Sequence, residues 1–231
     1  MKKNTTVILT LFFILTAESI FAEDLVFEKI PLSNGVDFSY LVKDSEWRFS
    51  EGEEKIIFVC WENHQDKFSD EMNLVKQSIE NTWQKESALV FKGWQKCRTV
   101  NEGIRILIED SGPRVQAFGK RIDREPNGMI LNFTFNNWRP DHDVHSYRNK
   151  YIKAIAVHEF GHALGFAHEQ NRPDTPCECS QRHGQDQPDE TILTPYDPDS
   201  VMNYCNKKYA NWGELSELDI KGLHKVYGAP N

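Results

Sequence analysis

Apolar residues along the chain follow the period of a strand in several short segments. The run KIIFVCW (55–61) is rich in β-branched and aromatic residues, which predicts a buried strand. In GIRILIED (103–110) three isoleucines alternate with other residues, and this pattern predicts a second strand. The segment GMILNFTF (128–135) predicts a third, and the shorter VQAFG (115–119) is a further candidate.

Helical spacing of apolar residues marks two longer segments in the first two thirds of the chain. In 69–87 apolar residues recur at 72, 75, 79 and 83, and Ser69 is the expected N-cap. In 146–166 the apolar face is longer, and Ser146 is the expected N-cap. Gly165 accepts a positive φ and would end this helix. The order strand, helix, two strands and a long helix predicts an α/β fold.

The last third of the chain begins with a segment of little periodicity. Residues 169–199 are rich in Pro, Asp and Gln, and a loop of this length is usually functional or held by disulfides. The segment 215–228 then predicts a final helix, because Ser216 and Asp219 have the spacing of a capping box.

The N-terminus has the pattern of an export signal. Lys2 and Lys3 precede an apolar stretch, and small residues follow up to Ala22. We therefore expect residues 1–22 to be a signal peptide, with an uncleaved anchor as the alternative. Residues 23–54 would be an N-terminal extension or short pro-segment, and 55–231 the main domain. This predicts a secreted or periplasmic protein with no stable membrane span after signal removal.

The negative net charge of the chain argues against some classes of binding partner. The chain has 231 residues and a net charge of −8, and removal of residues 1–22 would make it −9. Because no basic stripe is present, we expect no nucleic-acid partner. We also expect a monomer.

Five cysteines lie beyond the signal segment, in a protein expected to reach an oxidising compartment. We expect one disulfide between Cys60 and Cys97 and a second between Cys205 and either Cys177 or Cys179. The alternative is a set of reduced, buried thiols.

The candidate metal-binding and catalytic residues lie mostly in the segment HEFGHALGFAHE (158–169). His158 and His162 are four residues apart, so on a helix they lie on one face and can bind the same metal ion. After the turn at Gly165, His168 can return to that ion. Three neutral imidazoles with one open position form the ligand set of a catalytic zinc site. Exposed histidines on an ordinary helix are the alternative, but here they lie in an otherwise apolar helix.

Glu159 lies beside these ligands without being one of them. It can reach a water on the zinc, whose pKa the ion lowers to roughly 7, and act as general base. The zinc would also polarise the scissile carbonyl. This combination predicts hydrolysis of peptide bonds.

The extended motif H-E-x-x-H-x-x-G-x-x-H resembles that of the metzincin zinc peptidases. The residues that follow, Glu169, Arg172 and Asp174, resemble the astacin signature in particular. The resemblance implies a two-lobed fold with a mixed twisted sheet, a long active-site helix and a C-terminal lobe ending in a helix. It implies that 55–231 is a metallopeptidase catalytic domain with one zinc ion and a protein or peptide substrate.

The same resemblance assigns further roles. Met202, in SVMNY (200–204), would form the floor below the zinc. Tyr204 would be a fifth ligand that moves aside to support the transition state, or else a packing tyrosine. Glu169 would tie the lobes by a hydrogen bond. The segment 128–135 would be the edge strand that pairs with the substrate, with an interior strand as the alternative.

The sequence therefore predicts a secreted zinc-dependent endopeptidase. His158, His162 and His168 would bind zinc, and Glu159 and Tyr204 would be catalytic. The turn departs from the astacin pattern, since Asn203 stands where astacins usually have histidine, and the final segment is as close to matrixins. A matrixin-like peptidase and a zinc-bound peptide-binding or toxin module that does not cleave remain the alternatives.

Overall fold

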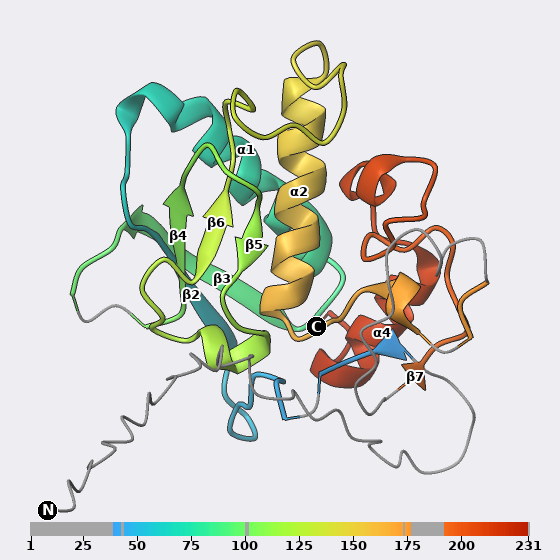
Figure 1. The fold of residues 1–231 in the computed structure, drawn as a ribbon. Helices are drawn as coiled ribbons and strands as arrows, with labels where there is room; N and C mark the ends of the chain where they lie inside the picture. Colours follow the sequence, from blue (N-terminus) through green and yellow to red (C-terminus); the bar gives the residue numbers. More distant parts are fainter. Residues whose placement is uncertain (1–38, 43, 100–101, 173, 177–191, 231) are drawn as a thin grey trace, which may run out of the picture.

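The computed structural model describes residues 39–42, 44–99, 102–172, 174–176 and 192–230. Helix α2 (Arg148–Ala163) runs through the centre, with a sheet and helix α1 (Ser69–Ile79) on one side and the segments that follow α2 on the other (Figure 1). The predicted α/β class with two lobes is confirmed. The segment 1–22, predicted to be a signal peptide, lies outside the described residues.

The main sheet is mixed and has five strands. Their spatial order is β3 (Leu89–Lys96), β2 (Lys55–Trp61), β4 (Ile104–Ile108), β6 (Met129–Leu131) and β5 (Arg114–Val115). Neighbouring strands are parallel except β5, which is antiparallel to β6. Nearly every residue of the interior strands β4 and β6 is buried, and in β2 only Phe58 is exposed, which explains the nearly continuous apolar runs in the sequence.

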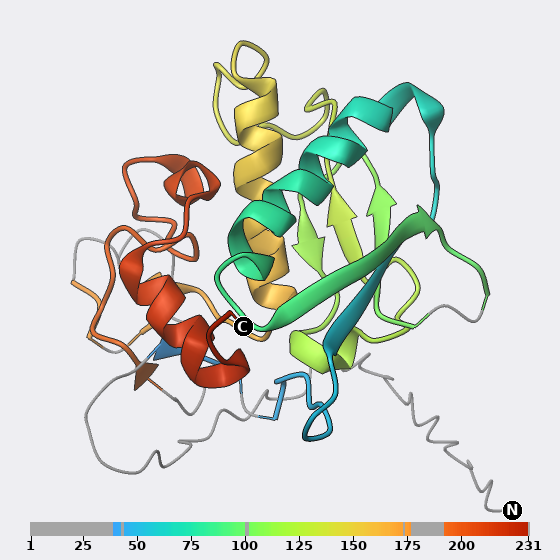
Figure 2. The same cartoon turned by 180° about the vertical axis from the view of Figure 1, so that it is seen from behind.

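Helix α1 crosses one face of this sheet and packs against α2 (Figures 1 and 2). Twelve of the 16 residues of α2 are buried, so this helix is enclosed by protein on nearly every side. Trp83 anchors it, because its indole Nε1 donates a hydrogen bond to the carbonyl oxygen of Val157 at 2.9 Å. Phe160 packs between the rings of Phe91 and Trp94. The candidate ligands therefore stand on the most constrained element of the fold.

Only the last of the three expected N-caps is present. Ser216 and Asp219 form a capping box at the start of α4 (Glu217–Tyr227). Ser69 and Ser146 cap nothing, because Phe68 and Tyr147 hold the N-cap positions without a side-chain bond. In both places a turn leads into the helix. The Asp66 carbonyl accepts the N–H of Ser69, and the Asp143 carbonyl accepts the N–H groups of Ser146 and Tyr147.

Strand β3 is absent from the sequence prediction. Its register with β2 shifts between Val59 and Cys60, opposite Gly93 and Trp94, which both have positive φ. This bulge breaks the alternation of apolar residues by which a strand is recognised.

The strand predicted over 128–135 is shorter than expected and has a different place in the sheet. It ends at Leu131, because the Asn132 side-chain oxygen accepts the N–H groups of Thr134 and Phe135 at 3.0 and 2.9 Å. Such an Asx turn competes with the ladder. The expectation that this segment forms the sheet edge is wrong, since β6 lies between β4 and β5, and β5 is the edge strand.

A second, two-stranded sheet joins the start of the described chain to its C-terminal part. Strand β1 (Ser39–Tyr40) pairs antiparallel with β7 (Ile192–Leu193). Leu41 forms a bridge with Phe166, and both Leu41 and Val42 are buried. Residues 39–42 therefore belong to the packed structure. Among the described residues, no helix has the length and apolar character that crossing a bilayer requires.

The predicted disulfide between Cys60 and Cys97 is confirmed, and it links the C-terminal ends of β2 and β3 across a sequence separation of 37 residues. Cys205 is also disulfide-bonded. Its expected partners, Cys177 and Cys179, lie outside the described residues.

Removal of the Cys60–Cys97 bond is expected to destabilise the fold through the unfolded chain, which regains the freedom of a closed loop of this length. We expect the double variant Cys60→Ala, Cys97→Ala to lose about 2–4 kcal/mol of unfolding free energy. Urea unfolding followed by tryptophan fluorescence measures this loss. A change below about 1 kcal/mol would show that the loop is already restricted in the unfolded state.

Candidate metal centre

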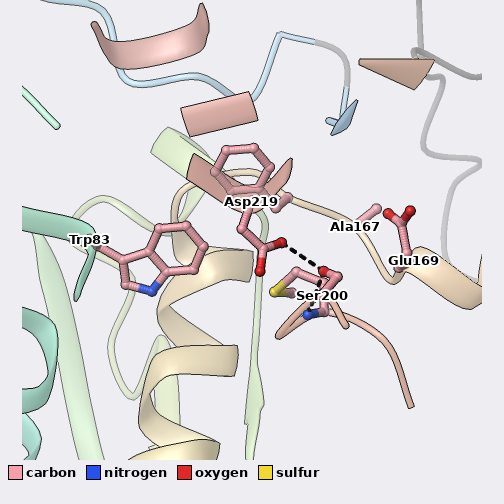
Figure 3. A pocket seen from close by; sticks show the side chains of 7 residues that line it. Trp83, Ala167, Glu169, Ser200 and Asp219 are labelled. Carbon is pink, nitrogen blue, oxygen red and sulfur yellow. Dashed lines mark hydrogen bonds between the residues drawn. The ribbon is translucent and has the colours of Figure 1, made fainter. Parts of the chain in front are cut away.

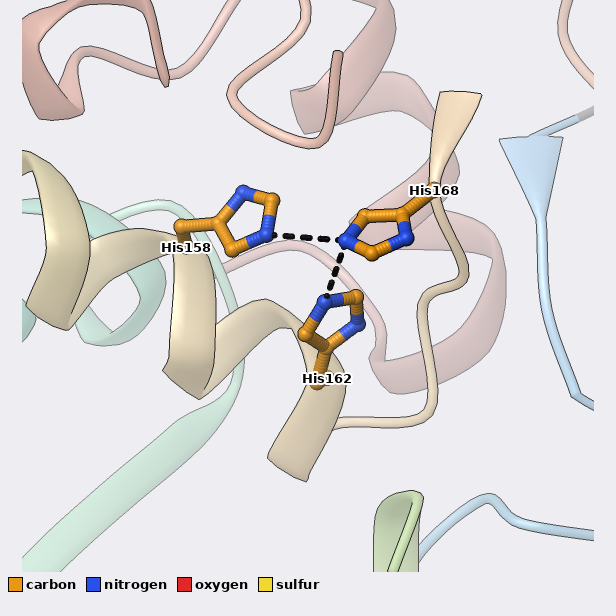
Figure 4. Close-up of side chains that lie close together, drawn as sticks. All are labelled: His158, His162 and His168. Carbon is orange, nitrogen blue, oxygen red and sulfur yellow. Dashed lines mark hydrogen bonds between the residues drawn. The ribbon is translucent and has the colours of Figure 1, made fainter. Parts of the chain in front are cut away.

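Three histidine side chains converge at the C-terminal end of α2 (Figure 4). His158 and His162 come from the helix, and His168 comes from the segment after the turn at Gly165, whose φ is 96°. The Nε2 atom of His168 lies 3.2 Å from Nε2 of His158 and 3.0 Å from Nε2 of His162. The structure thus brings together all three residues that the sequence predicts as ligands.

Backbone carbonyl groups fix the tautomer of the two helical histidines. The Nδ1 atom of His158 lies 2.7 Å from the carbonyl oxygen of Val201, and Nδ1 of His162 lies 2.8 Å from that of Phe166. Because a carbonyl oxygen can only accept, each Nδ1 carries the proton and each Nε2 keeps its lone pair. Such outer hydrogen bonds commonly orient the imidazoles that bind metals.

The donor set fits a zinc ion. Burial lowers the pKa of His158 to about 4 and that of His162 well below its ordinary value, so both rings are neutral at pH 7, as ligation requires. Zn–N bonds of 2.0–2.1 Å in a tetrahedron place nitrogens about 3.3 Å apart. The distances of 3.0 and 3.2 Å to His168 are close to that spacing.

Glu159 lies next to this group, 5% exposed. Its Oε2 atom is buried and makes no hydrogen bond to the residues that the structure describes. Burial raises the pKa of Glu159 to about 8, and the positive charge of Arg114 on β5 opposes the rise. A carboxyl group held in this state is suited to proton transfer.

The turn that carries Met202 contacts the candidate ligands through Val201, whose carbonyl oxygen lies 2.7 Å from Nδ1 of His158. The carboxylate of Asp219, on α4, accepts a hydrogen bond from the Ser200 hydroxyl at 2.7 Å (Figure 3). It also accepts one from the Val201 N–H at 3.0 Å. The Met202 carbonyl oxygen accepts the N–H of Glu169 at 3.0 Å, next to His168. The turn therefore holds both sides of the candidate ligand set.

A small cavity lies between this turn and α4 (Figure 3). Its volume is about 10 Å³, which is room for at most one water molecule. Residues of both lobes line it, among them Trp83 of the sheet lobe and Asp219 of α4. Because this cavity is too small for a substrate, it is part of the packing around the Met202 turn and not a binding site.

Tyr204 stands over the histidines. Its ring centroid lies 4.4 Å from that of His168 and 5.2 Å from that of His158, and 44% of the residue is exposed. Partial burial, and then the charge of Glu159, raise the pKa of the Tyr204 hydroxyl above its ordinary value. The hydroxyl stays protonated at neutral pH and can donate a hydrogen bond.

Within the described part of the chain, the Glu169 side chain bonds only to the C-terminal lobe and not, as expected, across the two lobes. Its Oε1 atom accepts the N–H of Asp197 at 2.8 Å and lies 3.3 Å from Nε of Arg172. The Arg172 guanidinium also donates two bonds of 2.8 Å to Asp174. All four residues follow α2, so the signature Glu-x-x-Arg-x-Asp holds the chain after His168 inside the C-terminal lobe.

Two contributions to the site are missing from the sequence prediction. Asp219 is recognised there only as part of a capping box, yet its carboxylate also anchors the turn at Ser200. The role of Val201 rests on its backbone carbonyl, which every residue type possesses. The sequence therefore contains a signal for Asp219 but none for Val201.

The contact between Gly161 and Met202 offers a test of how the turn supports the site. A Cβ atom at Gly161 would lie 2.3 Å from the Met202 sulfur. We expect Gly161→Ala to lower the unfolding free energy by about 1–3 kcal/mol and to weaken zinc retention, because Met202 must move. Alanine by itself stabilises a helix relative to glycine by about 1 kcal/mol. A net decrease in the unfolding free energy of Gly161→Ala would therefore be attributable to the steric clash with Met202.

Thermal melting and competition with a zinc chelator measure the two effects of Gly161→Ala. Gly112→Ala is the matched control, since its Cβ would make only ordinary contacts from 3.5 Å outward. Unchanged melting and zinc retention in Gly161→Ala would show that the turn does not set the ligand geometry.

Comparison with known proteins agrees with this geometry. The model of the astacin peptidase family matches residues 147–221. The zinc metalloproteinase dpy-31 of Caenorhabditis elegans is 27% identical over 159 residues. That match spans 63% of this chain and 24% of the relative, so the chain corresponds to about a quarter of that protein's length.

Solved structures show the same fold. Myroilysin has a TM-score of 0.60 at 18% identity, over 84% of this chain and all of that one. High choriolytic enzyme 1, a hatching enzyme zinc-protease of the medaka Oryzias latipes, has a TM-score of 0.52 at 16% identity, over 80% and 95% of the two chains. The resemblance of this chain to the astacin family of metzincins, predicted from its motif, is thus confirmed.

Proposed function

We propose that the protein is a zinc-dependent endopeptidase that acts on protein or peptide substrates. One observation carries the proposal: the Nε2 atoms of His158, His162 and His168 converge beside the buried carboxyl group of Glu159, whose Oε2 atom makes no hydrogen bond to the described residues. Ligands alone would fit a structural zinc site. An adjacent unpartnered carboxyl group fits catalysis.

The three histidines would hold one zinc ion. When bound, the ion supplies a Lewis acid that polarises the scissile carbonyl group and lowers the pKa of water in its open position. The Nδ1 bonds to Val201 and Phe166 would keep the rings aimed at the ion.

Glu159 would act as general base and then as general acid. Its carboxylate takes a proton from the water whose oxygen attacks the peptide carbonyl carbon. The same proton passes to the leaving nitrogen as the C–N bond breaks, which regenerates the carboxylate. The raised pKa of Glu159 matches a group that both accepts and returns a proton near neutrality.

Tyr204 would stabilise the transition state. Its hydroxyl belongs to a partly exposed ring beside two of the candidate ligands, and it stays protonated. A donor in this position can hydrogen-bond the negative charge that develops on the carbonyl oxygen.

We further propose that residues 1–22 direct export and are removed. Residues 23–54 would form an N-terminal extension, and 55–231 the catalytic domain. The protein would be secreted or periplasmic, act as a monomer and need no nucleic acid. The Cys60–Cys97 bond and the second disulfide at Cys205 support an oxidising compartment.

A zinc-bound module that holds peptides without cleaving them would need no buried carboxyl group beside the metal, so Glu159 argues against it. A matrixin-like peptidase is not favoured either, because the family model that matches residues 147–221 is that of the astacins.

Glu159→Gln separates catalysis from zinc binding. We expect the variant to keep one zinc ion per chain and to lose at least about 100-fold in the rate of cleavage of a mixed peptide library, because the amide cannot take the proton. Metal analysis and mass spectrometry of the cut peptides measure the two properties. A chelator should stop the wild-type protein, and zinc should restore it.

His162→Ala is the companion variant of Glu159→Gln and should lose both zinc and cleavage. Equal rates for Glu159→Gln and the wild type would contradict the assigned base. Zinc-loaded wild-type protein that binds peptides but cuts none, also after limited proteolysis, would establish the binding module instead.

Tyr204→Phe removes only the hydroxyl. We expect kcat to fall by about 100-fold with little change in KM, since the hydrogen bond is made chiefly in the transition state. Steady-state kinetics on one defined peptide provide both constants, and Tyr147→Phe, an exposed tyrosine at the start of α2, is the control. A rise in KM at constant kcat would assign Tyr204 to substrate binding alone.

A further inference from the structure

A large pocket opens beside Tyr204. Its volume is about 530 Å³, within the range of small-molecule and side-chain binding sites. Aromatic residues from three parts of the chain line it: Trp138, Tyr151, Tyr209 and Trp212, together with Tyr204 itself. The small cavity below the Met202 turn shares none of these residues.

Helix geometry places the pocket next to the candidate metal centre. Tyr151 precedes His158 by seven residues, which is two turns of α2, so both lie on one face about 10 Å apart along the axis. Tyr204 belongs to both places, because its ring packs on His158 and His168 and also lines the pocket. A polypeptide whose scissile bond lies at the metal can therefore place a neighbouring side chain in the pocket.

The aromatic walls are packed against one another. The Tyr151 ring lies 5.4 Å from the Tyr209 ring and 5.3 Å from the Trp212 ring, the latter edge to face at 82°. Lys150 places its ammonium group 4.1 Å from the centre of the Trp212 ring. These contacts pre-organise the pocket for a further ring.

The wall that carries Trp212 has an unusual backbone. Ala210, Asn211 and Trp212 all have positive φ, between 40° and 54°, in the turn Tyr209–Gly213 that lies beside α2 (Figure 1). Residues other than glycine rarely take this conformation, and they keep it only where surrounding contacts enforce it, often at ligand sites. Here Asn211 donates to the Glu214 carbonyl, and Glu214 pairs with Lys153 of α2.

The charges around the pocket are exposed. Arg139 and Lys207 lie at its lining and make no ion pair with the residues that the structure describes, whereas Asp141 accepts the Tyr151 hydroxyl. An exposed cation binds a carboxylate weakly, because water screens the pair. Contact of a buried aromatic ring with the five aromatic residues of the lining is the stronger interaction.

We propose that this pocket holds a large aromatic side chain of the substrate, on one side of the cleaved bond, and so determines specificity. The inference rests on the proposed peptidase function and deepens it. The competing occupant is an acidic side chain held by Lys207 and Arg139, and the experiment distinguishes the two.

The cleavage-site profile of the wild-type protein on a mixed peptide library is the first measurement. We expect Phe, Tyr and Trp to be enriched at one position next to the cut bond. Trp212→Leu and, from another part of the chain, Trp138→Leu should each lower kcat/KM for a Phe peptide at least 10-fold relative to its Ala counterpart. Melting and zinc content establish that each variant is folded.

Binding to Glu159→Gln tests the pocket without any cleavage. Calorimetry with zinc-loaded Glu159→Gln would compare three peptides that differ only in a central Phe, Ala or Asp. We expect the Phe peptide to bind at least 10-fold more tightly than the others. Trp212→Leu should remove this preference, and Phe58→Ala, which removes an exposed aromatic side chain on β2, should keep it.

Three outcomes keep the two proposals separate. Cleavage with a flat or acidic profile would overturn the aromatic pocket and leave the peptidase intact. No cleavage, but tighter binding of the Phe peptide, would overturn the peptidase and support the pocket. Equal binding of the three peptides, or preference for Asp, would overturn the pocket whatever the protein cleaves.

Discussion

The site depends on the backbone of one turn, Ser200–Met202. The Val201 carbonyl oxygen orients His158, and the Met202 carbonyl oxygen holds the N–H next to His168. The Asp219 carboxylate fixes this turn from α4, so the C-terminal helix controls the ligand set without touching it. Carbonyl groups suit this task, because they accept hydrogen bonds only and so dictate the tautomer that metal ligation needs.

Burial explains both the strength and the chemistry of this arrangement. The helix α2 is enclosed by the sheet lobe and by the C-terminal lobe, and the same enclosure keeps His158 neutral and Glu159 unusually basic. In water these groups would titrate near their ordinary values. Burial by the fold therefore determines the protonation states of His158 and Glu159.

The convergence of His158, His162 and His168 is predictable from the sequence because it follows from local geometry. Two of the histidines share a helix face, and Gly165 permits the turn to the third. Prediction from the sequence fails where an interaction between distant segments decides. The bulge in β3 requires a neighbouring strand, and the edge position of β5 is a property of the whole sheet. The side chain of Asn132, which ends β6, is held by hydrogen bonds to Asp110 and Ser111, about 20 residues earlier in the chain. Nothing in the sequence next to Asn132 indicates that its side chain ends a strand, and nothing next to Val201 indicates that its carbonyl group contacts His158.

One stretch of chain after the Met202 turn joins the candidate metal centre to the aromatic pocket. Tyr204 follows the turn, and the left-handed segment that carries Trp212 follows Tyr204 and packs on α2, whose other end holds the metal ligands. A shift of the turn would therefore move the floor of the metal site, the candidate transition-state donor and one wall of the pocket together. In the proposed peptidase, specificity and rate would be coupled through the backbone, because a side chain seated in the pocket would also fix the position of Tyr204 relative to the three histidines.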